Sequence, residues 1–164
     1  METKQFREAT IDFMHRFGFE LPVELPLLDW PLQRREETSV CIRMLCMHAI
    51  AACSYGFNRF SALSWMTREG VEIAMTHDER EFVSNGKGDA KRFQTRIEGL
   101  WALAWSLQVI PTMDFQKSCD NSLVRVLPNL KTGESSTALR SSVSLRPIQS
   151  LAEKLDLAYC LHWL

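Results

Sequence analysis

The chain has 164 residues, of which 46% are hydrophobic and 24% are charged, and its formal net charge is −1. These proportions are those of a globular protein with a buried core, and they exclude a disordered or fibrous protein. The near-balance of 19 basic and 20 acidic residues excludes a strong field that would steer the chain to nucleic acid or to anionic lipid. No apolar run is long enough to span a bilayer. We therefore expect a single cytoplasmic domain over residues 1–164, with no nucleic-acid partner and no membrane partner.

The N-terminal part predicts one amphipathic helix followed by an extended segment. Thr3 is a suitable N-cap residue, and Gly18 follows the last turn of the helical pattern. The side of this helix that we expect to be buried consists of Phe6, Phe13, Met14 and Phe17. Residues 19–31 are expected to run extended over the core, because prolines cannot continue a helix. These prolines are Pro22, Pro26 and Pro31.

Two further helices are predicted next. The segment Glu36–Tyr55 has almost no polar face in its second half, which is typical of a helix at the centre of a core. Gly56 and Asn58 interrupt the pattern. Ser61 can then cap a helix that stops near Gly70.

The middle of the chain contains two start signals for helices. Thr76 and Glu79 have the spacing of a capping box, in which each side chain accepts a hydrogen bond from the backbone amide of the other residue. The short helix that begins there is expected to end at Asn85 and Gly86. Asp89 is expected to cap the helix that follows.

The longest helical pattern runs over Asp89–Gln108. Its apolar stripe recurs at helical spacing and consists of Phe93, Ile97, Leu100, Trp101, Ala104 and Leu107. Arg96 and Glu98 interrupt this apolar surface, where a charge is costly unless it is paired. Because two residues that are two apart cannot face the same side of a helix, each must pair with another segment. We expect Glu98 to pair with Arg140. We expect Arg96 to pair with Asp156.

The C-terminal part is less strongly patterned until its last helix. Residues 112–144 are polar, and only Leu123–Leu127 is apolar enough for a short buried piece. Pro147 suits the first position of a helix whose apolar residues recur to the end of the chain. Together the elements predict a mainly α fold. We expect a single-domain orthogonal bundle of about six helices around two central apolar helices, the segments Glu36–Tyr55 and Asp89–Gln108.

The charged and glycine-rich segments contain no recognisable catalytic pattern. His77 lies beside Asp78 and Glu79, but acidic residues in a first helical turn are expected from the helix dipole alone. The Gly86–Gly88 turn lacks the glycine spacing of a phosphate-binding loop, and Asp89 after it would repel a phosphate. We interpret both segments as ordinary helix starts.

The five cysteines are expected to be reduced and structural: Cys41, Cys46, Cys53, Cys119 and Cys160. Most of them lie in apolar helical patterns, where thiols behave as small hydrophobic groups. Where a cysteine and a histidine are near each other in the sequence, they are two residues apart and point to different sides of a helix. We therefore expect no metal, no cofactor and no catalytic residue.

Three motifs, taken together, resemble a bacterial family catalogued as domain of unknown function 4272. They are Glu98 with Leu100–Leu107, the stretch Ala138–Ser141, and the stretch Leu155–Trp163. The likeness covers most of the chain in the expected order. It implies that relatives close the long helix with a glycine where this chain has Gln108. It also implies that relatives continue beyond the last motif, so we expect the chain to lack a C-terminal portion.

Two classes of function are compatible with these patterns. The resemblance implies little about activity, but some relatives look like small accessory proteins encoded near bacterial toxins. This favours a non-enzymatic protein-binding protein, specifically an immunity protein that occludes the active site of a cognate toxin. The polar surface expected to bind the toxin includes Thr76, His77, Asp78, Glu79, Glu81, Glu134 and the loop Gly133–Ser144. The alternative is an enzyme with a polar pocket around Arg96, Glu98 and Arg140, since charges held at unusual positions also gather at functional sites.

Overall fold

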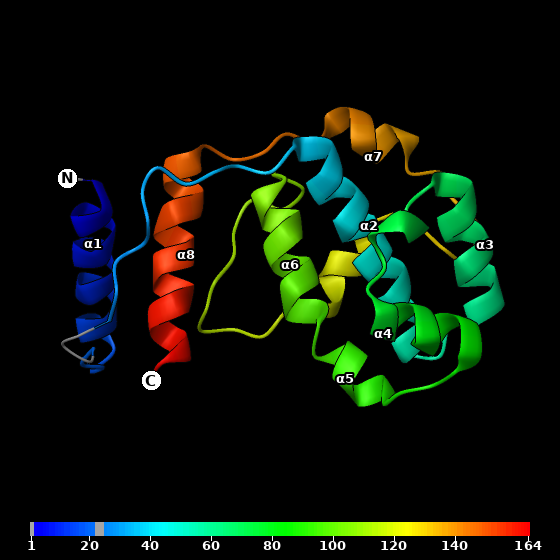
Figure 1. Cartoon of the computed structure of the whole chain (residues 1–164), viewed down its shortest axis with the longest axis horizontal. Coiled ribbons are helices and arrows are strands. Elements are labelled where there is room, and N and C mark those ends of the chain that lie inside the picture. The colour runs from blue at the N-terminus through cyan, green and yellow to red at the C-terminus, as the bar shows by residue number, and fades with distance from the viewer. Residues whose placement is uncertain (1, 22–24) are drawn as a thin grey trace. The chain divides into compact units, whose positions relative to one another are not determined.

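Helices make up the regular structure of residues 2–21 and 25–164, the part of the chain that this computed structural model describes (Figure 1). No strand occurs among these residues, so the predicted mainly α class is confirmed. The chain divides into two compact units. Unit 1 comprises Met1–Arg34 and Arg146–Leu164, and unit 2 comprises Arg35–Leu145. The predicted single domain with an orthogonal arrangement stays a prediction.

Unit 1 consists of two helices and the segment that follows the first of them. Helices α1 (Glu2–Arg16) and α8 (Ile148–His162) lie side by side and run in the same direction (Figure 1). The aromatic rings of Phe6 on α1 and Trp30 pack at 5.4 Å between centroids. Phe6 and Met14 are buried as expected, whereas the expected burial of Phe17 is wrong, because 46% of this side chain is exposed just after α1 ends. Pro22 lies outside the described residues.

A buried ion pair joins the two helices of unit 1. The Arg7 guanidinium donates to both carboxylate oxygens of Asp156, with its Nη2 2.9 Å from Oδ1 and its Nε 3.1 Å from Oδ2. The same guanidinium donates to the backbone carbonyls of Leu25 and Pro26. One arginine therefore fastens both α8 and the extended segment to α1.

Unit 2 contains the remaining helices. They are α2 (Glu37–Ser54), α3 (Arg59–Glu69), η1 (Glu72–Ala74), α4 (His77–Arg80), η2 (Glu81–Asn85), α5 (Ala90–Gln94), α6 (Ile97–Ser106), η3 (Asn121–Arg125) and α7 (Thr137–Ser142). Helix α2 contacts α3, α5 and α6 (Figure 1). Its second half is buried around its whole circumference, including Met44, Leu45, Cys46, Ala49 and Ile50. The prediction that this helix is central is confirmed for unit 2.

Most of the predicted helix starts of unit 2 are confirmed. Thr76 and Glu79 form the capping box of α4, and the Asp89 side chain accepts a hydrogen bond from the Lys91 amide at the start of α5. The cap of α3 differs from the prediction. The Asn58 side chain accepts from the Ser61 amide at 2.9 Å, so the helix begins three residues earlier than expected.

The helix predicted over Asp89–Gln108 is broken at its centre. A turn at Thr95 and Arg96 separates α5 from α6. The Thr95 hydroxyl donates to the Arg92 carbonyl at 2.9 Å, and the Arg96 amide bonds to the carbonyl three residues back rather than four. Because α6 starts after Arg96, Glu98 occupies a first helical turn and not the middle of an apolar helix.

The weakly patterned segment before α7 contributes a short buried piece, as predicted. Leu123 and Leu127 are buried, while Val124 and Val126 between them are exposed. Helix α7 itself was not predicted.

Helix α6 ends in a left-handed residue that is not glycine. Gln108 has a φ of +59°. The Val109 amide bonds to the Ala104 carbonyl at 2.9 Å and the Gln108 amide bonds to the Trp105 carbonyl at 3.0 Å, which is the hydrogen-bond pattern of a Schellman ending. Glycine is favoured at this position because it has no Cβ to clash. The glycine expected in relatives would therefore stand at a backbone position that favours glycine, although Gln108 occupies it in this chain.

We predict that Gln108→Gly is more stable than Gln108→Ala by about 1 kcal/mol in the free energy of unfolding. Both changes remove the hydrogen bonds from the Gln108 side chain to Ser144, so only the left-handed backbone distinguishes them. Urea denaturation followed by circular dichroism measures the difference. Equal stabilities would contradict the strained ending.

Candidate functional site

A fully buried carboxylate connects three segments of unit 2. The Glu79 side chain has no exposed surface, and its Oε2 lies 2.7 Å from Arg43 Nη1 and 2.8 Å from the Thr76 amide. Its Oε1 lies 2.8 Å from Arg43 Nη2 and 2.6 Å from Arg96 Nη1. Burial raises the pKa of Glu79, but the hydrogen bonds from Arg43 and Thr76 and the charges of both arginines outweigh it and hold the pKa below its usual value.

The four charged residues expected to form ion pairs have other partners. Arg96 pairs with Glu79 and not with Asp156, which pairs with Arg7 in unit 1. The Glu98 carboxylate accepts a hydrogen bond from the Cys119 amide at 2.9 Å, and no ion pair of Glu98 occurs among the described residues. Arg140 donates to other groups of unit 2. The three side chains of the expected polar pocket thus belong to three separate arrangements.

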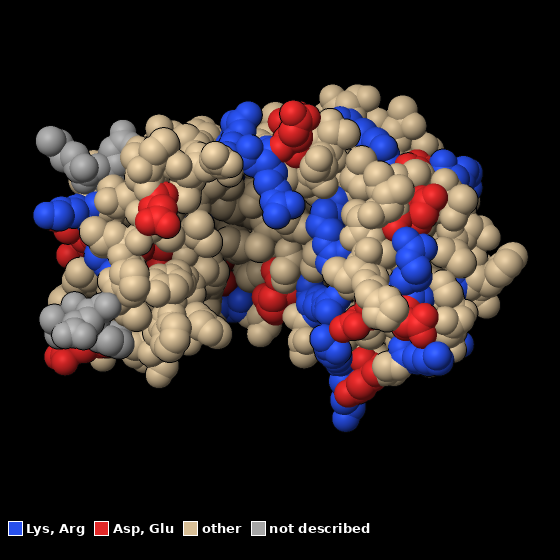
Figure 2. All heavy atoms as spheres, in the orientation of Figure 1, with Lys and Arg blue, Asp and Glu red and all other residues tan. Residues whose placement is uncertain are grey.

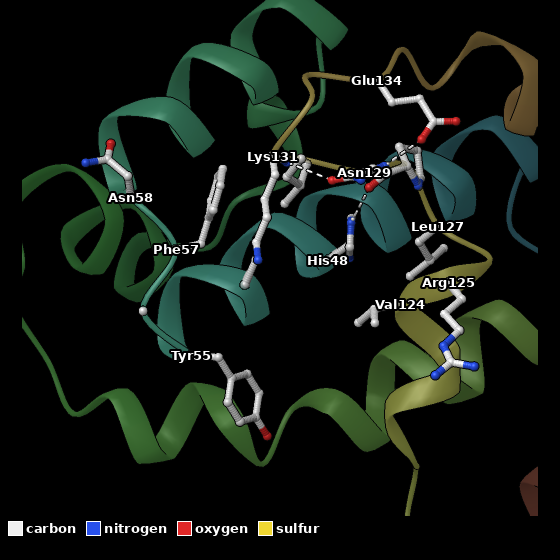
Figure 3. Close-up of a pocket in the computed structure, with 14 residues that line it drawn as sticks. His48, Tyr55, Phe57, Asn58, Val124, Arg125, Leu127, Asn129, Lys131 and Glu134 are labelled. Atoms are coloured by element: carbon white, nitrogen blue, oxygen red, sulfur yellow. Dashed lines mark hydrogen bonds between the residues drawn. The ribbon is translucent and has the colours of Figure 1, made fainter.

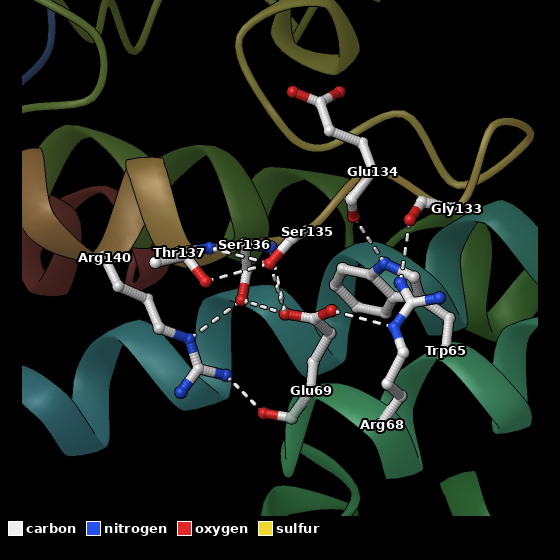
Figure 4. A network of polar contacts seen from close by, with 9 residues as sticks. All are labelled: Trp65, Arg68, Glu69, Gly133, Glu134, Ser135, Ser136, Thr137 and Arg140. Atoms are coloured by element: carbon white, nitrogen blue, oxygen red, sulfur yellow. Dashed lines mark hydrogen bonds and ion pairs between the residues drawn. The ribbon is translucent and has the colours of Figure 1, made fainter.

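Arg140 belongs to a network that fastens the start of α7 to the end of α3 (Figure 4). Its Nε donates to the Ser136 hydroxyl at 2.9 Å, and its Nη2 donates to the Glu69 carbonyl at 2.6 Å. The buried Ser136 hydroxyl in turn donates to Glu69 Oε2 at 2.7 Å. Burial raises the pKa of Glu69, but the Ser136 and Arg68 hydrogen bonds outweigh it and lower the pKa. This part of the expected partner-binding loop is therefore internally bonded.

The residues expected to bind a partner differ in accessibility. Thr76, His77 and Asp78 are exposed, but Glu79 is fully buried, so the expectation that it contacts a partner is wrong. It faces inward because its carboxylate neutralises charge on two arginines. Glu81 is half-buried. The proposed roles of the exposed members stay predictions.

Charges around α4 and α5 are largely paired with one another. Asp78 pairs with Arg92 at 2.9 Å, and Glu81 pairs with Lys87 at 3.2 Å. Figure 2 shows basic and acidic side chains interspersed over this part of unit 2. The face in view therefore presents no surface of a single charge sign there.

An open cavity of about 920 Å³ lies at the C-terminal end of α2 (Figure 3). Its lining comes from the last turns of α2, from residues 55–58 that follow this helix, and from residues 124–125, 127–131 and 134. Tyr55 and Val124 at the cavity are 63% and 49% exposed. Single exposed apolar side chains are common on protein surfaces, but an aromatic and an aliphatic side chain exposed in the same cavity are informative.

The cavity has two cations, of which Arg125 helps to lower the pKa of Asp120 without forming an ion pair with it. Arg125 and Lys131 are exposed, and neither forms an ion pair among the residues that the structure describes. Figure 3 shows Lys131 extending from its loop toward the end of α2. The one carboxylate of the lining, Glu134, turns back to its own loop, where Oε2 accepts from the Asn129 amide at 2.8 Å. The lining therefore has an excess of positive charge.

His48 and Trp65 anchor the loop that carries Lys131. His48 Nε2 lies 2.9 Å from the Pro128 carbonyl, and because a carbonyl can only accept, this nitrogen carries the proton. Trp65 Nε1 donates to the Glu134 carbonyl at 2.8 Å. Burial lowers the pKa of His48 more than the Pro128 hydrogen bond raises it. The neutral ring and the indole hold both ends of the loop in place.

The thiols near the core are poorly suited to nucleophilic catalysis. Burial raises the pKa of Cys46 to about 12 and that of Cys53 to about 11, so both stay protonated at neutral pH. No group of three or more histidine, cysteine, aspartate or glutamate side chains suited to a metal ion occurs within residues 2–21 and 25–164. Across the same residues, none of the helices has the length and apolarity needed to cross a membrane.

Comparison with known proteins identifies a family. The model of the family described as Domain of unknown function (DUF4272) matches residues 6–164. The chain belongs to this family. No curated protein and no solved structure matches it. The function of this DUF4272 chain must therefore be argued from its own residues.

The cavity of this DUF4272 chain was not predicted from the sequence. Its walls join His48 and Tyr55 to residues about 80 positions later, and no periodicity marks that later segment. One available signal was Tyr55, a large aromatic residue directly before the Gly56 that ends the central helix. Another was the pair of cations Arg125 and Lys131 on either side of a short apolar piece.

We predict that Glu79→Gln lowers the free energy of unfolding by about 3 kcal/mol, because Arg43 and Arg96 keep their charges without the carboxylate. Asp78→Asn is the control, since it removes an ion pair whose two side chains are both exposed. That change should cost less than about 1 kcal/mol. Urea denaturation at neutral pH measures both free energies of unfolding. Equal decreases in the two variants would show that Glu79 contributes no more to stability than Asp78.

We predict that His48→Gln removes a pH dependence of stability. The pKa of His48 lies below its ordinary value of 6.5 in the folded protein, so the unfolded chain takes up the proton first as the pH falls. Wild-type stability should therefore decline from about pH 7 to about pH 5, above the range in which most carboxylates titrate. A glutamine amide can still donate to Pro128 but does not titrate. Unfolding free energies at both pH values test this, and an unchanged decline in the variant would contradict it.

Proposed function

We propose that this chain is a non-enzymatic protein-binding protein that contacts its partner through the cavity at the end of α2. The observation that carries the proposal is the exposure of Tyr55 and Val124 beside two unpaired cations in a cavity of about 920 Å³. Apolar and aromatic side chains with a polar rim are typical of surfaces that bind proteins. Tyrosine and arginine are also over-represented among the residues that dominate binding energy.

The chemistry of the lining supports binding rather than catalysis. Among the described residues of the lining, His48 is the one side chain whose ordinary pKa is near neutrality. Its Nε2 is occupied by the Pro128 carbonyl, and the ring is buried. A general base needs a nitrogen or oxygen within reach of the proton that it removes.

The anchored loop supports a tight complex. Binding costs free energy when flexible segments must be ordered, and a loop that is already held loses less. His48 and Trp65 hold the loop of Lys131 by hydrogen bonds of 2.9 Å and 2.8 Å. A preformed surface of this kind suits a protein that must inhibit its partner.

In its specific form, the proposal is that this chain is an immunity protein that binds a cognate toxin in the cytoplasm and covers the active site of the toxin. The support for a toxin as the partner is the expectation, drawn from the family likeness, that some relatives are accessory proteins encoded near toxins. Thr76, His77 and Asp78 would provide a second polar contact surface.

The test is co-expression with the product of each neighbouring gene, followed by calorimetry on any complex. We predict that Tyr55→Ala weakens the complex about 30-fold, the effect of losing a central aromatic contact. Phe60→Ala is the matched control, because Phe60 is 80% exposed but does not line the cavity. It should change the affinity less than about threefold.

Cell survival provides the second measurement. Cells that express the neighbouring toxin should die without this chain, survive with the wild type and with Phe60→Ala, and grow poorly with Tyr55→Ala. Survival without this chain would contradict the immunity role. A complex that is equally sensitive to both substitutions would contradict the cavity as the binding surface.

A further inference from the structure

We propose that the partner segment that occupies the cavity is acidic and presents an apolar side chain next to its carboxylates. This inference rests on the proposed function, because it names the chemistry of the partner at the same cavity. It follows from a comparison of the cations of unit 2 that form internal ion pairs with those that form none.

Several cations of unit 2 are held by its own carboxylates. Arg43 and Arg96 share Glu79, and Arg92 pairs with Asp78. Arg125 and Lys131 differ from these, since both line the cavity and neither forms an ion pair among the described residues. Two unpaired cations at one cavity create a positive potential that a neutral or basic segment cannot balance.

The carboxylate of the lining does not neutralise them. Glu134 Oε2 accepts from the Asn129 amide at 2.8 Å within its own loop, as the dashed contact in Figure 3 shows. Lys131 is also not needed to cap α2. The last carbonyls of this helix already accept backbone amides, including those of Tyr55 and Phe57 at 3.1 Å and 2.9 Å.

The apolar part of the lining defines the second requirement on the partner. Tyr55 and Val124 are exposed, Phe57 is half-buried, and Leu127 is buried. An aromatic or aliphatic side chain of the partner can cover this surface while neighbouring carboxylates reach the two cations. A carboxylate can meet the Arg125 guanidinium with two parallel hydrogen bonds, which adds geometric specificity.

Other anionic occupants fit the whole chain less well. A nucleic acid would meet a protein of net charge −1, and the face in Figure 2 carries acidic side chains beside its basic ones. A second copy of this chain could present its own carboxylates. Both are included as outcomes of the test.

The test selects a phage-displayed library of random peptides on the whole wild-type protein. The expected peptides carry two or more acidic residues beside a leucine or an aromatic residue. Their affinities are then measured by fluorescence anisotropy for the double variant Arg125→Glu and Lys131→Glu. Each reversal should weaken binding about fivefold, and the two together about 25-fold.

The matched control is the double variant Arg35→Glu and Lys91→Glu. Both residues are exposed, lie outside the lining, and form no ion pair within the described part of the chain. The same change in net charge should weaken binding less than about threefold. Urea denaturation checks that every variant folds. The urea concentration at the midpoint of unfolding should match that of the wild type.

Several results would overturn the inference. These are peptides without acidic enrichment, or acidic peptides that bind the reversed variant and the control equally. A dimer that the reversal dissolves would assign the cavity to a second copy, and cavity-dependent binding of a single-stranded oligonucleotide would assign it to nucleic acid. A partner that needs Tyr55 but not the two cations would overturn this inference alone. Indifference to Tyr55→Ala would instead overturn the proposed function.

Discussion

The arrangement of unit 2 depends on where one negative charge can be buried. A carboxylate that loses all contact with water must recover that free energy from hydrogen bonds and opposite charges. Glu79 does so with two arginines from other segments, Arg43 on α2 and Arg96 before α6, and with the Thr76 amide of its own capping box. The chain cannot shift any of these segments without leaving a buried charge unpaired. The carboxylate therefore fixes α4 and the start of α6 against the central helix.

The need to pair the buried Glu79 carboxylate is consistent with the break in the helix between α5 and α6. Arg96 reaches Glu79 at 2.6 Å, and its guanidinium also lies 4.8 Å from the centre of the Phe93 ring. The Thr95 hydroxyl bonds back to the Arg92 carbonyl at this point. The turn directs Arg96 to the buried carboxylate and places Leu100 and Ala104 on the face that is buried within unit 2.

The sequence correctly predicted the features that depend on interactions between neighbouring residues. The capping box of Thr76 and Glu79, the cap at Asp89 and the apolar second half of α2 each depend on a few neighbouring residues. The ion pairs were wrong because pairing depends on tertiary distance. The pairing of Glu79 with two arginines was not predicted for the same reason. The capping box already explains a glutamate at this position without them. The cavity was missed because its walls are far apart in the sequence.

Internal ion pairing divides the charged residues into those that support the fold and those that are free to contact another protein. A side chain that neutralises an internal partner can contact another protein only by giving up that interaction. If Glu79 contacted another protein, its arginine partners would lose their carboxylate. Asp78 and Glu81 each form an ion pair with a neighbouring cation. Arg125 and Lys131 form no ion pair among the described residues, although Arg125 interacts with the exposed Asp120 carboxylate. Lys131 lies on a loop that His48 and Trp65 already hold at both ends. A partner that neutralised these cations would gain charge pairing without disrupting the fold, which is the reason that the proposed function places recognition at the cavity and not at the α4 surface.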